Sequence, residues 1–166
     1  MPEKKTIERA KKAQRRGKSP STQSGEFVRE EMHHIREGKH GARSTKQAIA
    51  IGLSKARRAG VDLPPPEKGR VSEKTRRSAA RAYDKGRRGD VETPPRRSRA
   101  RERALKREGR SAASRKALSK QARSVARHRP RAARSASARQ AAGTKGRRGR
   151  SIAARKAARK REARRV

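Results

Sequence analysis

The sequence predicts a mostly α-helical protein in which a short N-terminal helical hairpin precedes a largely disordered, Arg/Ala-rich tail of marginal helices. Two stretches, residues 21–38 and 44–61, carry apolar side chains at helical spacing between clear start and stop signals. Only 28% of the 166 residues are hydrophobic, and there is one Phe, one Tyr and no Trp. Residues 64–166 hold 37 Lys and Arg against 8 acids, whereas residues 1–63 hold 16 against 7. So few large apolar side chains cannot offset the conformational entropy of ordering the whole chain.

Residues 1–20 are interpreted as a basic arm. Their only apolar face is formed by Ile7, Ala10 and Ala13, so a helix there would be weakly amphipathic. Pro20 and the residues before it separate the arm from the hairpin.

The first helix of the hairpin is expected over residues 21–38, with Gly38 as its stop. The second is expected over residues 44–61. Ser44 and Gln47 have the spacing of a capping box, in which the serine hydroxyl accepts from the Gln47 N–H and the Gln47 side chain reaches back. Gly60 is expected to end this helix in the left-handed conformation, with Val61 packing back on its last turn.

The connection of residues 38–43 is short and contains two glycines, so the two helices should form an antiparallel pair spanning residues 21–63. Six apolar side chains are predicted to form the hairpin core: Phe27, Val28, Met32, Ile35, Ile49 and Leu53. A unit of about 40 residues is near the lower limit for independent folding, and a homodimer formed through the hairpin is one way to complete it.

The tail, residues 64–166, contains Ser-capped segments rich in Ala and Arg between Gly and Pro residues. Marginal helices are expected over residues 72–84, 98–108, 111–129 and 151–165. Like charges repel along such helices, so they are expected to form when phosphate neutralises them rather than before.

The net charge of +38 predicts a dense polyanion as the partner, and nucleic acid is the commonest one. There is no apolar run long enough to cross a membrane and no secretory leader, so a cytoplasmic, nucleoid location is expected, with no membrane or small-molecule partner.

Arginine suits phosphate through its planar fork of donors and lysine through its compact charge. Fourteen cations are predicted to bind nucleic acid: Arg57, Arg58, Arg96, Arg97, Arg147, Arg148, Arg150, Arg155, Lys156, Arg159, Lys160, Arg161, Arg164 and Arg165.

Readout of base sequence is poorly supported, because there is no zinc finger and no aromatic platform. The segment KGRRGRS over residues 145–151 is similar to a minor-groove hook but lacks the proline that follows its core, so a flexible basic hinge is preferred. Residues 44–59 could act as the recognition helix of a helix-turn-helix, but a docking or dimerisation hairpin is favoured because no third helix braces the motif.

A metal site is not predicted, although His33, His34 and His40 lie near Glu30 and Glu37. Adjacent histidines on a helix point about 100 degrees apart and rarely reach one ion. There is no cysteine and no Ser-His-acid arrangement, so neither an enzyme nor a cofactor is expected.

The stretches SPSTQSGEFVREEMHHIREGKHGARSTKQAIAIGLSKARRAGV and LPPPEKGRVSEKTRR, over about residues 19–77, resemble an uncharacterised family of small, highly basic bacterial proteins. That resemblance implies DNA binding without an established activity. The tail is similar in composition to the tails of linker histones and of bacterial histone-like proteins, which condense DNA without reading its sequence, but it uses much more Arg than Lys.

The leading hypothesis is sequence-nonspecific nucleic-acid binding by a nucleoid-associated, histone-like protein that binds and compacts DNA. Two alternatives stay open. One is an RNA- or ribosome-associated basic protein, and the other is an adaptor whose hairpin recruits a protein partner to nucleic acid.

Overall fold

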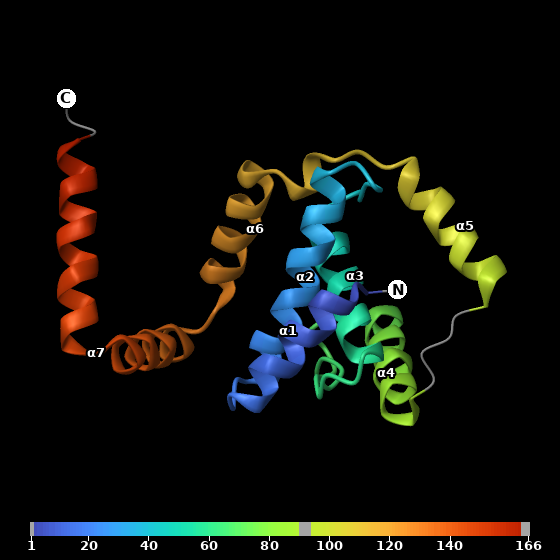
Figure 1. Ribbon diagram of the computed structural model, residues 1–166, viewed down its shortest axis with the longest axis horizontal. Helices are drawn as coiled ribbons and strands as arrows, with labels where there is room; N and C mark the ends of the chain where they lie inside the picture. Colours follow the sequence, from blue (N-terminus) through green and yellow to red (C-terminus); the bar gives the residue numbers. More distant parts are fainter. Residues whose placement is uncertain (1, 90–93, 164–166) are drawn as a thin grey trace. The chain divides into compact units, whose positions relative to one another are not determined.

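The computed structural model describes residues 2–89 and 94–163, apart from the side chains of residues 144, 145 and 160. The described residues form seven α-helices and one 3-10 helix, with no strand among them (Figure 1). In chain order these are α1 (Lys4–Arg15), α2 (Pro20–Arg36), α3 (Thr45–Arg58), α4 (Glu73–Arg88), α5 (Pro95–Lys106), η1 (Ser111–Ala113), α6 (Arg115–His128) and α7 (Arg131–Glu162). The chain divides into two compact units, residues 1–121 and 122–166.

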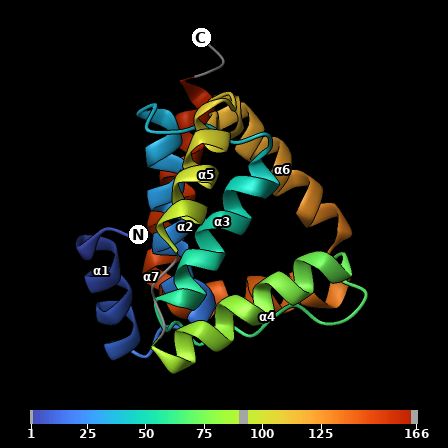
Figure 2. The same cartoon turned by 90° about the vertical axis from the view of Figure 1, so that its right-hand side faces the viewer.

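The prediction of a short hairpin followed by a largely disordered tail is wrong. Helices α4 to α7 occupy most of the predicted tail, and α1 occupies most of the predicted basic arm. In the first unit α1 packs on α2, α2 on α3, and α3 on α4, so the α2–α3 pair is braced on both sides (Figures 1 and 2). The compositional argument failed because it counted large apolar side chains, whereas this core is built mainly from alanine and from glycine at close helix crossings.

Two apolar clusters form the core of the first unit. The first contains Met32, Ile35, Ala42, Ala48, Ala112 and Ala113, with Val28, Ile49 and Leu118 packed against it. The second contains Ala10, Phe27, Ala56 and Val61, with Ile7, Ala59 and Leu63 against it. The six predicted hairpin residues are therefore divided between the clusters. Phe27 packs with α1, Leu53 is half-buried and belongs to neither cluster, and the other four contribute to the first.

Glycine lets the helices of the first unit approach closely. A Cβ atom on Gly52 of α3 would lie 2.7 Å from Val28 Cα of α2. A Cβ atom on Gly86 of α4 would lie 1.9 Å from the carbonyl oxygen of Arg57 on α3. Neither position has room for a side chain, so backbone contact at these crossings replaces the large apolar side chains that the chain lacks.

The predicted ends of α3 are confirmed. Ser44 Oγ accepts a hydrogen bond from the Gln47 N–H at 3.2 Å, and Gln47 Oε1 accepts one from the Arg43 N–H at 2.8 Å. Gly60 has a φ of +85°. The Val61 N–H donates to the Ala56 carbonyl at 3.1 Å, and the Val61 side chain is buried beside that residue. Local side-chain and backbone chemistry therefore sets both ends of this helix.

Residues near η1 close the end of the α2–α3 pair by hydrogen bonds to backbone carbonyls. Thr45 Oγ1 donates to the Ala112 carbonyl at 2.7 Å, and Arg36 Nε donates to the Ala113 carbonyl at 2.9 Å. The Gly41 N–H donates to the Leu105 carbonyl at 2.9 Å. These contacts, with the burial of both alanines, order a segment that the sequence places in a disordered tail.

The second unit is helical but has no buried side chain among those described in residues 122–163. Helix α7 bends at Gly146, whose φ of 62° and ψ of 176° are not helical, so two helical rods meet there (Figure 1). The bend lies within the predicted basic hinge. Among the described residues, none of the helices combines the length and apolar character that crossing a membrane requires.

Candidate nucleic-acid interface

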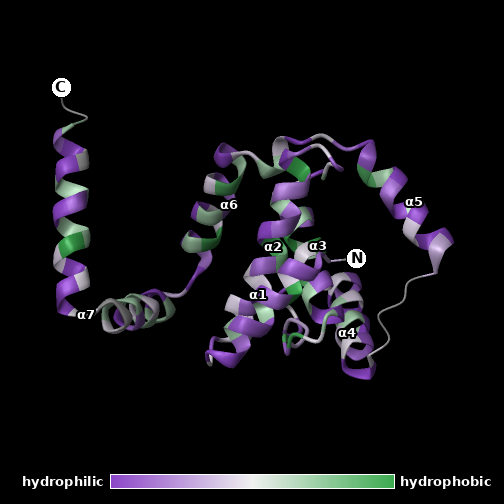
Figure 3. Ribbon diagram, in the orientation of Figure 1, coloured by the Kyte–Doolittle hydropathy of each residue, from purple (hydrophilic) through white to green (hydrophobic). Residues whose placement is uncertain are grey.

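Positive charge is distributed unevenly over the helices. Helix α7 carries twelve Lys and Arg against one acid, and α5 carries six against one. Helix α2 is the exception, with two arginines against three glutamates. Figure 3 shows hydrophilic, purple bands along α5, and along α7 purple bands that alternate with pale green ones. Three acids therefore lie on the core helix α2 of the first unit, while the largest surplus of Lys and Arg over acids lies on α7.

The structure places most of the predicted nucleic-acid contacts on exposed helical surface. Two are exposed at the start of α5, namely Arg96 and Arg97. Seven are exposed on α7 beyond its bend: Arg147, Arg148, Arg150, Arg155, Lys156, Arg159 and Arg161. The Lys160 side chain and residues Arg164 and Arg165 lie outside the described part of the chain.

Arg57 differs from the others because it points into the first unit. It is 6% exposed, and its guanidinium donates from Nε to the Leu63 carbonyl at 2.9 Å and from Nη2 to the Pro64 carbonyl at 3.3 Å. Burial lowers its pKa. Arg57 therefore holds the segment after α3 against the end of that helix, and the two donors that it uses there are not available to phosphate.

Arg58 is half-buried, and its Nε donates to the Ser54 carbonyl at 3.3 Å. Its pKa is lowered first by burial and then by the positive charge of Arg101 on α5. The positive charges of Arg58 and Arg101 repel each other, and an anion bound between them would relieve that repulsion. Arg101 was not among the predicted contacts, because the sequence alone does not show that α5 brings it near α3.

The last part of α7 has a cationic face. At about 100 degrees per residue, Arg155, Lys156 and Arg159 lie on one side, and the alanines at positions 153, 154, 157 and 158 lie mostly on the other. Arg155 and Arg159 are separated by about 6 Å along the helix axis, at about 1.5 Å per residue. Duplex DNA carries one negative charge per about 1.7 Å of its axis, so these side chains can meet several phosphates at once.

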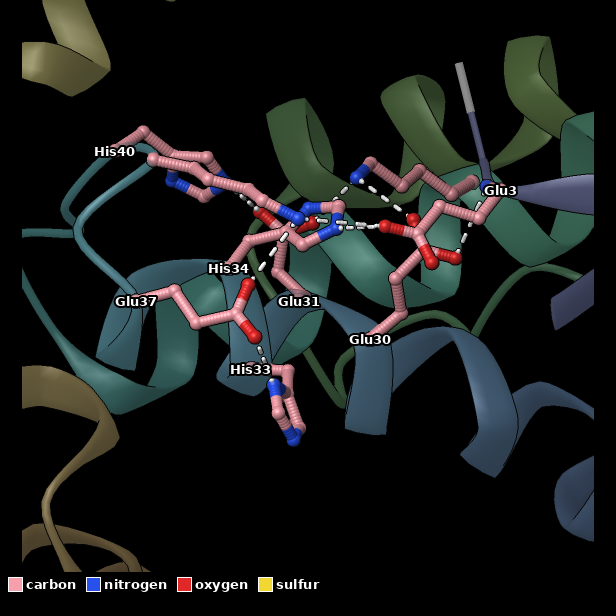
Figure 4. A network of polar contacts seen from close by, with 9 residues as sticks. Glu3, Glu30, Glu31, His33, His34, Glu37 and His40 are labelled. Carbon is pink, nitrogen blue, oxygen red and sulfur yellow. Dashed lines mark hydrogen bonds and ion pairs between the residues drawn. The ribbon is translucent and has the colours of Figure 1, made fainter. Parts of the chain in front are cut away.

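A second polar site lies on α2, and sequence reasoning missed it (Figure 4). The Glu31 side chain is fully buried, and Lys55 Nζ of α3 lies 2.7 Å from its Oε2 atom. His40, from the connection between α2 and α3, places its Nε2 atom 3.2 Å from Glu31 Oε1. Glu30 lies beside them, 3.5 Å from Lys55 Nζ, and accepts from the Glu3 N–H at 3.2 Å.

The outer part of this network joins α1 to the end of α2. Glu3 Oε1 lies 2.8 Å from His34 Nε2, while Glu37 Oε1 lies 2.8 Å from His33 Nδ1. The two adjacent histidines therefore point to different partners, as predicted. The pKa of Glu3 is lowered mainly by its hydrogen bond with His34. The pKa of Glu37 is lowered first by Lys39, whose Nζ atom lies 3.1 Å from Glu37 Oε2, and then by the hydrogen bond with His33.

Comparison with known proteins gives one family. Residues 3–68, which are 66 of the 166 residues, match the model of a family described as "Family of unknown function (DUF6496)". This stretch covers α1, α2, α3 and the extended segment after α3. No curated protein and no solved structure matches the chain. The chain is thus similar over its N-terminal part to a family whose description names no activity.

Proposed function

We propose that this protein binds nucleic acid without reading base sequence, and that its natural polymer is duplex DNA, which it coats and compacts. The observation that carries the proposal is the set of exposed cations on α7. This helix contains twelve Lys and Arg and one acid, and none of its described side chains is buried. Such a helix carries a large surplus of positive charge, so phosphate is its natural complement.

The binding energy in this proposal comes from counterion release. Each cation that meets a phosphate frees condensed ions from the polymer, which makes affinity fall steeply with salt. Contacts of this kind position a protein on the backbone but carry no information about base sequence. Sequence-independent binding follows.

The aromatic residues favour a duplex over single strands. Single-stranded polymers are held by exposed rings on which bases stack. Phe27 lies in the core with 1% of its surface exposed, and the Tyr83 hydroxyl donates a hydrogen bond to Asp62. With one Phe, one Tyr and no Trp in the sequence, no aromatic stacking platform is available.

The proposed interface is tested with two triple variants that change the same charge. Arg155, Lys156 and Arg159 on α7 are replaced by Gln, and the control replaces Lys11, Lys12 and Arg15 on α1. The control cations are exposed and have the same i, i+1, i+4 spacing. If the three α7 residues each contact one phosphate, the slope of log K against log salt falls in magnitude by about 2.7, since each contact contributes about 0.9.

The control should leave that slope nearly unchanged. Equal losses in both variants would show that net charge alone matters and would refute the assignment of the interface to α7. The same titration with an RNA duplex decides between the polymers. Tighter binding to RNA at equal salt would replace the DNA proposal with that of an RNA- or ribosome-associated protein.

A further inference from the structure

We propose that Glu31, His34 and His40 form a binding site for a divalent transition-metal ion with the ligand preferences of Zn²⁺. Each residue offers one ligand atom, and the three atoms lie within 4.8 Å of one another. No part of the nucleic-acid proposal uses these residues.

The chain topology brings the three ligands together from two directions (Figure 4). Glu31 and His34 are separated by three residues on α2, the Glu-x-x-His spacing that helical bundles use to project two metal ligands from one helix. His40 returns from the connection after α2, and its ring meets that of His34 edge-on, with centroids 6.1 Å apart. The sequence analysis weighed His34 and His40 as ligands but predicted no metal site, because it did not pair His34 with Glu31.

The ligand spacing suits a small ion. Glu31 Oε1 and His40 Nε2 are 3.2 Å apart. Two ligands of a tetrahedral Zn²⁺, at about 2.0 to 2.1 Å from the metal, are separated by roughly 3.3 to 3.4 Å. These two atoms therefore already have the separation of two corners of a zinc tetrahedron. His34, whose ligand atom lies within 4.8 Å of both, would supply the third corner by moving closer.

The surroundings of the three ligands resemble the outer shell of a metal site. His40 Nδ1 lies 3.0 Å from the Gly41 carbonyl, so a proton held there leaves the Nε2 lone pair facing Glu31. Lys55 Nζ holds the Oε2 atom of Glu31, which leaves Oε1 for the metal. The Glu3 carboxylate beside His34 makes the carboxylate–imidazole contact that commonly orients a metal-bound histidine.

The charge balance also calls for a cation. The network of Figure 4 contains four carboxylates (Glu3, Glu30, Glu31 and Glu37) and two ammonium groups (Lys39 and Lys55), so two negative charges remain when the imidazoles are neutral. Glu31 is fully buried, and despite its close ion pairs neither of its oxygens accepts a well-aligned hydrogen bond. A divalent ion would neutralise the surplus and satisfy that buried carboxylate.

The donor set selects the class of ion. Two imidazoles and one carboxylate suit Zn²⁺ and its neighbours in the transition series, whereas Mg²⁺ and Ca²⁺ prefer oxygen ligands alone. Three protein ligands leave a fourth position for water.

The test uses the full chain, freed of nucleic acid by nuclease and high salt and stripped of metal with a chelator. Zn²⁺ is titrated into it and the retained metal is measured after gel filtration, while Co²⁺ is used as a spectroscopic probe of tetrahedral coordination. The proposal predicts one Zn²⁺ per chain, visible absorption typical of tetrahedral Co²⁺, and a higher unfolding temperature that a chelator reverses.

Variants identify the ligands. His34→Gln and His40→Gln are expected to lower Zn²⁺ affinity by about 100-fold or more, since loss of an outer-shell partner alone costs about 10- to 100-fold. His33→Gln is the matched control, because His33 lies next to His34 in sequence but contacts Glu37 and is largely exposed. Circular dichroism establishes that each variant is folded. Failure of the wild-type chain to retain Zn²⁺, or equal losses in all three variants, would overturn the proposal.

Discussion

Replacing Gly86 by alanine tests the packing of α4 on α3, which the sequence alone did not predict. The new Cβ atom would lie 1.9 Å from the Arg57 carbonyl oxygen, 2.9 Å from its carbonyl carbon and 3.3 Å from Arg58 Cα. All three are backbone atoms, so no side chain can rotate away to make room. The two helices must separate, and we expect the alanines at positions 79 and 82 of α4, which are buried, to become more exposed as they do so.

The expected effect is the sum of two opposing contributions. Overpacking against a rigid neighbour costs typically 1 to 3 kcal/mol, and backbone contact places this case near the upper end. Alanine favours a helix over glycine by about 1 kcal/mol. The net loss in the free energy of unfolding is therefore about 2 kcal/mol.

Urea unfolding measures this loss, and Tyr83 fluorescence is a suitable signal because the single tyrosine of the chain lies on α4. Gly25→Ala is the control. Gly25 is helical in α2 with nothing within 4 Å of its Cβ position, so its replacement should stabilise the protein by about 1 kcal/mol. Equal stabilities of the two variants would refute the packing of α4 described above.

Two further predictions concern single hydrogen bonds. Ser44→Ala should lower the free energy of unfolding by about 1 kcal/mol, because it removes the hydrogen bond that caps α3. Ser19→Ala should lower it by less, because Ser19 makes no cap hydrogen bond. Urea unfolding of both variants tests the difference. The Tyr83 pKa is raised, mainly by the hydrogen bond that its hydroxyl donates to Asp62. Ultraviolet titration of the phenolate should therefore give a midpoint above the ordinary value of about 10. Asp62→Asn should lower that midpoint. Stability from this contact is present below that ordinary value and is lost as the pH rises through the raised pKa; a midpoint at or below the ordinary value would contradict the contact.

Features set by neighbouring residues could be read from the sequence. The Ser44 cap and the left-handed Gly60 depend on side chains and backbone within one or two turns of helix, and both are found. Ser72 likewise caps α4, accepting a hydrogen bond from the Thr75 N–H at 3.3 Å. Such signals locate helices even where the composition argues against a stable fold.

Features that depend on contacts between residues far apart in the chain could not be predicted from the sequence. Ala112 and Ala113 are buried only because η1 packs against α2 and α3, and nothing in their own segment shows this. Arg57 was expected to face solvent, yet the carbonyls of Leu63 and Pro64 need donors, and a long guanidinium reaches both. The Glu31–His34 spacing was visible, but Lys55 and His40 complete the site from elsewhere in the fold.

The most direct test of the proposed function is the salt dependence of binding by the full chain to duplex DNA of random sequence. If 6 to 10 phosphates are contacted, affinity should fall by about 10³ to 10⁵ between 50 and 200 mM salt, along a straight line in log K against log salt. Duplexes of different base sequence should give the same line. Absence of binding at 50 mM salt, or affinity that barely changes with salt, would contradict the proposal that exposed cations on these helices bind the DNA backbone.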